Sequence, residues 1–198
     1  MNRKKLKGRK MMMMNPRITR SATALFLLIA AVLACKSGTT TSETDKANKL
    51  VDEGNAAVQD AKKFVADAEA KKAQMMQTDV RRLAEARVAA AESIAAYDRA
   101  AEKCKAAAQK YDEASRLQIN DKFKEYLILK VKEYNKRGEM IETAKGTPQA
   151  LIESTNRSSF IIRANSNNSK VDQLYKEAED IGSQADKLQK DNPNIFKS

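Results

Sequence analysis

Two cysteines carry the most distinctive chemistry of this chain, and their surroundings differ. Cys35 directly follows an apolar stretch, whereas Cys104 stands in a charged, alanine-rich segment. A cysteine can serve as nucleophile, redox group, metal ligand or lipid attachment site. The 198 residues include no histidine, so the usual base of serine and cysteine hydrolases and the commonest metal ligand are both missing. We therefore expect no metal site, no catalytic residues and no cofactor.

The segment before Cys35 has the three parts of a secretory signal. Positively charged residues without any acidic residue come first, and the apolar run ATALFLLIAAVLA follows at 22–34. This run of 13 residues is shorter than the roughly 20 that a membrane-spanning helix needs. We expect residues 1–34 to be a signal peptide that is cleaved between Ala34 and Cys35.

The sequence Val32-Leu33-Ala34-Cys35 resembles the lipobox of bacterial lipoproteins, with Leu33 at a position where a small residue is more usual. The resemblance implies that Cys35 carries a diacylglyceryl group with palmitate-like chains, which would hold the protein at a membrane. An ordinary signal peptidase, leaving a free thiol, is the alternative. Lys36 after the cysteine would permit sorting to an outer membrane, so we expect a cell-envelope location facing the periplasm or the exterior.

Net charge does not point to nucleic acid once the leader is set aside. The whole chain has 37 basic and 26 acidic residues, but eight of the basic ones precede Cys35, which leaves a net charge of +3. Between Arg99 and Lys145, glutamates such as Glu133 and Glu139 are interleaved with basic residues, which predicts a solvated helical face. Neither GxGxxG nor GxxxxGK[ST] occurs. A hydrolase using two carboxylates is the least favoured function.

Apolar residues recur at spacings of three and four from residue 46 to residue 192, which predicts amphipathic helices. The pattern changes phase at 77–79 and at 120–121, where we expect turns. We predict an all-α fold, either an elongated antiparallel bundle or a coiled coil of about four long helices. Residues 35–45 would form a flexible tether with the lipidated cysteine, 46–192 the helical domain and 193–198 a C-terminal tail.

Three details of the last third are predicted from residues that favour turns. Gly146 is expected to end the third helix, with Thr147 as the cap of a new helix and Pro148 at its first position. The polar stretch NSNNS at 165–169 is either a turn or a polar patch on one long helix. Pro193 is expected to close the last helix.

Several other residues have both a functional and a packing interpretation, and packing is favoured for each. Cys104 is a redox or cross-linking group, or a small buried hydrophobe. Met75 and Met76 are an adaptable contact surface, or gap-filling side chains. Four tyrosines line a cavity for an apolar ligand, or pack in the core. These are Tyr97, Tyr111, Tyr126 and Tyr134.

The function we expect is non-catalytic: a membrane-tethered envelope lipoprotein whose long helices serve as a structural or protein-interaction module. Its partners would be the membrane, through the acyl chains on Cys35, and an envelope protein or a second copy of the chain. The alternative is a binding module that holds a lipid or another apolar ligand between its helices.

Overall fold

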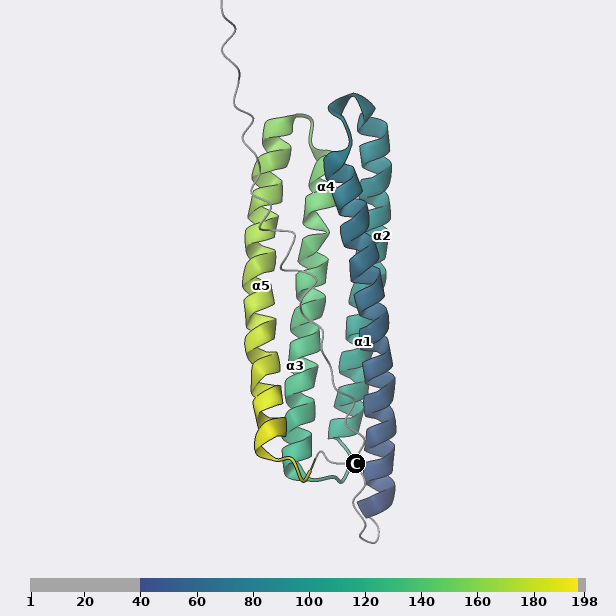
Figure 1. Cartoon of the computed structure of the whole chain (residues 1–198), viewed down its shortest axis with the longest axis vertical. Coiled ribbons are helices and arrows are strands. Elements are labelled where there is room, and N and C mark those ends of the chain that lie inside the picture. The colour runs from purple at the N-terminus through teal and green to yellow at the C-terminus, as the bar shows by residue number, and fades with distance from the viewer. Residues whose placement is uncertain (1–39, 196–198) are drawn as a thin grey trace, which may run out of the picture.

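The computed structural model describes residues 40–195, and these form an all-α helical bundle. Four long helices run up and down alternately: α1 (Thr40–Gln77), α2 (Leu83–Ser115), α3 (Asp121–Ala144) and α5 (Arg157–Asp191). A single 3-10 turn, η2 (Val80–Arg82), precedes α2, and the short α4 (Gly146–Glu153) extends α3 (Figure 1). The predicted fold class is confirmed.

The first two turns fall where the apolar pattern changes phase. Asp79 caps η2 by accepting a hydrogen bond from the Arg81 backbone N–H at 2.8 Å. Asn120 caps α3 in the same way, with its side chain accepting from the backbone N–H groups of Lys122 and Phe123. A side-chain acceptor at the N-cap satisfies N–H groups that have no partner within the helix.

The break predicted at Gly146 is present, because α3 ends at Ala144 and α4 follows it, but the predicted cap Thr147 and the predicted first position Pro148 were wrong. Helix α4 already begins at Gly146, and Thr147 does not cap it: its hydroxyl donates instead to the Asn168 side chain of α5 at 3.1 Å. The backbone N–H of Gln149 donates to the carbonyl of Lys145, which is the N-cap residue of α4. The chain turns only at 154–156, where Asn156 caps α5.

The helical region begins earlier than predicted and ends within one residue of the predicted position. Helix α1 begins at Thr40, six residues before the start that the sequence indicated, so part of the expected tether is helical. Helix α5 runs through 165–169 without interruption, which makes the NSNNS stretch a polar patch on one long helix. It ends at Asp191, with Asn192 as its C-cap, directly before Pro193.

Each long helix packs mainly on its neighbour in the chain: α1 on α2, α2 on α3, and α3 on α5. Helices α1 and α5 consequently lie on opposite sides (Figure 1). The main core is rich in alanine where α1 meets α2, and small side chains let these two helices approach closely. A second, smaller cluster of Met75, Ala86, Ala89 and Ala90 lies at the end where α1, α2, α4 and α5 have their turns.

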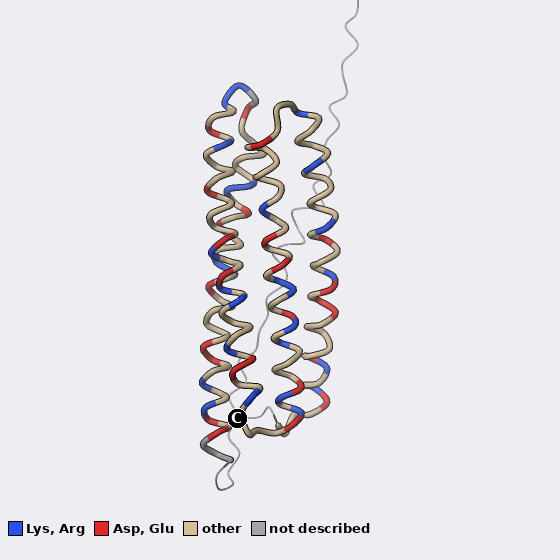
Figure 2. The backbone as a smooth tube through the Cα atoms, turned by 180° about the vertical axis from the view of Figure 1, so that it is seen from behind, with Lys and Arg blue, Asp and Glu red and all other residues tan. Residues whose placement is uncertain are grey.

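Charged residues of both signs are distributed along the length of every long helix (Figure 2). Most of their ion pairs are exposed or half-exposed, such as Lys136 with Glu139 at 2.8 Å. Exposed pairs of this kind contribute little to stability. No helix within residues 40–195 is long and apolar enough to cross a membrane.

Candidate functional site

The predicted cleavage and lipidation residues, Ala34 and Cys35, lie outside the described residues. Cys104 is buried in α2, and burial raises the pKa of its thiol to about 12. Such a thiol is almost entirely protonated at neutral pH and is a poor nucleophile. Met75 is buried beneath the turn between α1 and α2, whereas Met76 is exposed.

The four predicted tyrosines are all buried, and they come from two neighbouring helices, α2 and α3. The rings of Tyr111 and Tyr134 lie 5.6 Å apart between their centroids, so they fill the interface between the helices. The Tyr111 hydroxyl donates to the Asn55 side chain of α1 at 2.7 Å. Gly54 makes room for this ring, because a Cβ at that position would lie 3.0 Å from it.

A second polar contact joins α1 to α2 nearer the other end. The Tyr97 hydroxyl hydrogen-bonds to the carboxylate of Glu69, and Lys72 donates to the same hydroxyl at 3.1 Å. The Ser93 hydroxyl donates to the backbone carbonyl of Ala68 at 2.9 Å. Buried polar groups that find partners in this way fix the register of two helices.

The most unusual feature of the interior is a group of three charged side chains on α3. Lys130, Glu133 and Arg137 are 3%, 3% and 5% exposed. Lys130 Nζ donates to one carboxylate oxygen of Glu133 at 2.6 Å, and Arg137 Nε donates to the other at 2.8 Å. The prediction that Glu133 belongs to a solvated face was therefore wrong. Charged residues are almost never fully buried unless they are paired.

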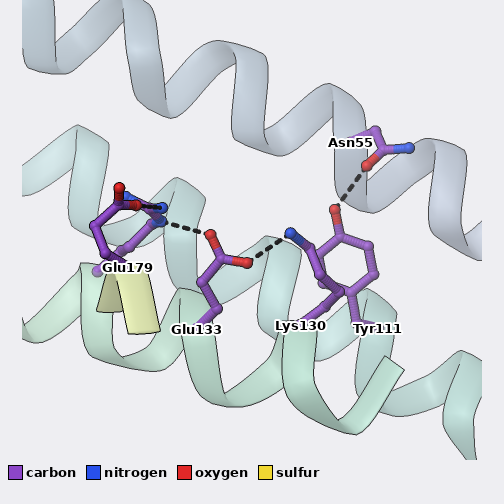
Figure 3. Close-up of polar contacts among 6 residues, drawn as sticks. Asn55, Tyr111, Lys130, Glu133 and Glu179 are labelled. Atoms are coloured by element: carbon purple, nitrogen blue, oxygen red, sulfur yellow. Dashed lines mark hydrogen bonds and ion pairs between the residues drawn. The ribbon is translucent and has the colours of Figure 1, made fainter. Parts of the chain in front are cut away.

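Helix α5 covers this buried charge cluster. Arg137 reaches across and donates to Glu179 at 3.1 Å. Gly182 lies directly over the Glu133 carboxylate, where a Cβ would come within 3.2 Å of it. Glu133 thus binds two cations on its own helix, and Arg137 ties that helix to the next (Figure 3).

The charges of the cluster also act on α1, which packs on the side of the bundle away from α5 (Figure 1). Burial lowers the pKa of Lys62 on α1, and the nearby charges of Arg137 and Lys130 lower it further. Lys130 also lies 5.0 Å from the centroid of the Tyr134 ring, a cation–π distance. The Tyr134 hydroxyl is buried and has no hydrogen-bond partner among the described residues.

This arrangement is better suited to holding helices than to catalysis. Each oxygen of Glu133 accepts a hydrogen bond from a cation, so neither is directed at a substrate. A general acid or base needs access to the proton that it transfers. One signal in the sequence was missed: Gly182 stands inside a helix without a turn to explain it, and such a glycine marks a close approach of two elements.

Comparison with known protein families, with curated proteins and with solved structures found no match to this chain.

Proposed function

We propose that the protein is a non-catalytic lipoprotein of the cell envelope, a rigid helical rod that is held at a membrane through Cys35 and acts by contact with another protein. The observation that carries the proposal is the leader: an apolar run of 13 residues whose last three, Val-Leu-Ala, are followed directly by Cys35. A single acyl chain binds a membrane only marginally, so the two or three chains of a lipoprotein are needed for stable anchoring.

The bundle supports this function through the place where its first helix begins. Helix α1 starts at Thr40, so only four residues separate it from Cys35. Four residues span at most about 14 Å. A lipid on Cys35 would therefore hold the Thr40 end of the rod close to the membrane. The 38 residues of α1 give the rod a length of about 57 Å.

An anchored rod acts by holding a binding surface at a set distance from the membrane and by confining that surface to the membrane plane. Anchoring raises the effective concentration of that surface toward other proteins of the same envelope. The buried charge cluster suits a rod, because the bond from Arg137 to Glu179 fixes the position of α5 on α3. Exposed charged side chains, such as those of Glu139 and Glu153, favour solubility of the rod.

One observation favours the alternative function, a module that binds an apolar ligand between its helices. The buried Tyr134 hydroxyl has no partner among the described residues, and a ligand could supply one. Native mass spectrometry of the purified protein tests this alternative. A bound small molecule that is lost in Tyr134→Phe would support ligand binding, and a ligand-free mass would count against it.

Intact mass spectrometry of the protein purified from membranes tests the main proposal, with Cys35→Ser and Cys104→Ser as variants. We expect loss of residues 1–34 and addition of a diacylglyceryl-sized mass. The addition and the membrane location should disappear in Cys35→Ser and persist in Cys104→Ser. A cleaved chain with an unmodified Cys35 would refute the tethering mechanism.

A further inference from the structure

Exposed aliphatic side chains gather at one end of the rod. Seven large hydrophobic residues are exposed among those the structure describes, and six of them lie near the two turns at the end opposite Thr40. Both turns are at the top of Figure 1. We call residues 76–92 and 148–165 the distal tip. Its exposed aliphatic residues are Met76, Leu83, Val88, Ile152, Ile161 and Ile162.

These side chains are not part of a core. The cluster beneath them consists of Met75 and three alanines, with Leu151 and Phe160 packed against it. Ile162 is 69% exposed and Val88 is 59% exposed, although smaller polar residues would serve at both positions if only solubility mattered. Grouped exposed apolar residues on a soluble domain mark interaction sites.

The charged residues of the distal tip differ from those of the rest of the domain. The chain after Cys35 has 21 lysines and eight arginines, yet residues 76–92 and 148–165 contain five of the arginines and no lysine. A lysine that borders them, Lys71, is paired with Glu92 at 2.7 Å. Arginine is enriched and lysine depleted in protein–protein interfaces, because the planar guanidinium is weakly hydrated and binds carboxylates with two hydrogen bonds. The exposed aliphatic residues and the excess of arginine over lysine are two features that the tip shares with protein–protein interfaces.

Three of these arginines have no carboxylate partner. Arg82 and Arg163 form ion pairs within the tip, with Glu85 and Glu153. The remaining three form no ion pair among the described residues, and they are Arg81, Arg87 and Arg157. Exposed cations beside an apolar patch are complementary to an apolar patch with carboxylates beside it.

We propose that the distal tip is the docking surface for a different protein whose contact surface is apolar at its centre and acidic at its rim. The proposal deepens the proposed function and rests on it only for orientation, since anchoring at Cys35 would turn this end away from the membrane. The aliphatic side chains would be buried at the centre of the contact, and the three unpaired arginines would bind carboxylates around it.

Two other occupants fit the observations less well. In a symmetric contact with a second copy, the three unpaired arginines of one tip would need carboxylates on the other tip. Three of the four carboxylates there already form ion pairs, and they are Glu85, Glu92 and Glu153. An anionic membrane attracts clusters of about four to eight lysines and arginines. The five arginines of the tip are offset by Asp79, Glu85, Glu92 and Glu153, which leaves a net charge of +1.

Site-specific photo-crosslinking in intact cells of the native host tests the proposal on the full, processed chain. A photoreactive residue replaces Ile162 in the tip or, as the matched control, Ile128, an exposed aliphatic residue near the opposite end. We expect a protein adduct from position 162 that is not formed from position 128. Mass spectrometry of the adduct identifies the partner and the peptide that was in contact.

Binding of the purified partner then tests the chemistry. Ile162→Asp and Arg157→Glu should each weaken the affinity at least about tenfold, which corresponds to roughly 1.4 kcal/mol. Ile128→Asp should leave the affinity unchanged, and added salt should weaken the wild-type complex. All three positions are exposed, so circular dichroism should report the same helix content for every variant.

Several outcomes would overturn the proposal: an adduct with a second copy of the chain, capture of lipid only, no adduct, or equal adducts from both positions. A partner whose contact peptide lacks acidic residues, or an affinity that Arg157→Glu does not change, would do so as well. Failure of the anchor is a separate result. If Cys35 proves unmodified while the purified partner still binds the tip, the tethering is refuted and the docking surface stands.

Discussion

Replacing Glu133 with glutamine isolates the contribution of the buried charge cluster. Glutamine keeps the size of the side chain but removes the negative charge between Lys130 and Arg137. Arg137 keeps Glu179 at 3.1 Å, whereas Lys130 loses its only ion pair within residues 40–195 while 3% exposed. Breaking a buried pair by removing one partner costs about 3–5 kcal/mol of unfolding free energy.

A loss of that size lowers the midpoint of thermal unfolding by roughly 6–20 °C in a domain of this length. Denaturant titration followed by circular dichroism measures the free energy directly. Glu139→Gln is the matched control, because Lys136 and Glu139 have the same spacing on the same helix, with the Glu139 side chain 51% exposed. That exposed pair should contribute less than about 1 kcal/mol.

Equal effects of Glu133→Gln and Glu139→Gln would refute the reasoning, because they would mean that water reaches Lys130 and Glu133. A combined replacement distinguishes the loss of a partner from the value of the cluster. Changing Lys130→Met, Glu133→Leu and Arg137→Met together leaves no unpaired charge on α3. It should give a stability equal to the wild type or higher by up to about 4 kcal/mol.

Three further predictions concern the helix contacts and pH. Gly182→Ala should destabilise the fold, because its Cβ would press against a buried carboxylate at 3.2 Å, whereas Gly138→Ala, with 3.8 Å to its nearest neighbour, should stabilise the helix by about 0.5–1 kcal/mol. Denaturant titration distinguishes the two variants, and a stabilising Gly182→Ala would contradict the close approach. Tyr111→Phe should lower the free energy of unfolding by about 1 kcal/mol, because it removes the hydrogen bond to Asn55, while Tyr134→Phe, which removes an unpartnered hydroxyl, should be neutral or stabilising. The reverse order of stability in thermal unfolding would mean that the hydroxyl of Tyr134 has a partner. Burial raises the pKa of all four core tyrosines, so their neutral forms stabilise the fold fully below pH about 10, and this stability is lost as the pH rises further. In a Tyr175→Phe background, which removes the one half-buried tyrosine, phenolate absorbance should therefore appear together with loss of helix, and ionisation of all four in the intact helical fold would disprove it.

Sequence periodicity was sufficient for the fold class and for two turns. The turns at 77–79 and 120–121 could be found because the apolar pattern changes phase there and because Asp79 and Asn120 are good caps. The break at Gly146 was also found, but the cap was not, because the Thr147 hydroxyl binds Asn168 of α5 and Lys145 occupies the N-cap position. The break at 154–156 had no phase change to reveal it.

The buried charges could not be found from local sequence. Lys130 with Glu133 and Lys136 with Glu139 have the same residue types and spacing, yet the first pair is buried and the second is exposed. The difference lies in α5, which covers one face of α3 and brings Gly182 over Glu133. The distal tip needed the structure as well, because its two segments are about 60 residues apart in the chain and meet only when the bundle forms.

The cover that α5 provides has a consequence for the way the chain reaches its fold. Each long helix packs on the one before it, so α1, α2 and α3 can assemble while the last helix is still disordered. The face of α3 that waits for α5 then presents Lys130, Glu133 and Arg137 to water rather than a row of aliphatic side chains. Partly folded chains associate mainly through exposed apolar surface. We therefore expect the charges that lie buried in the finished bundle to limit aggregation of any form in which α5 has not yet docked.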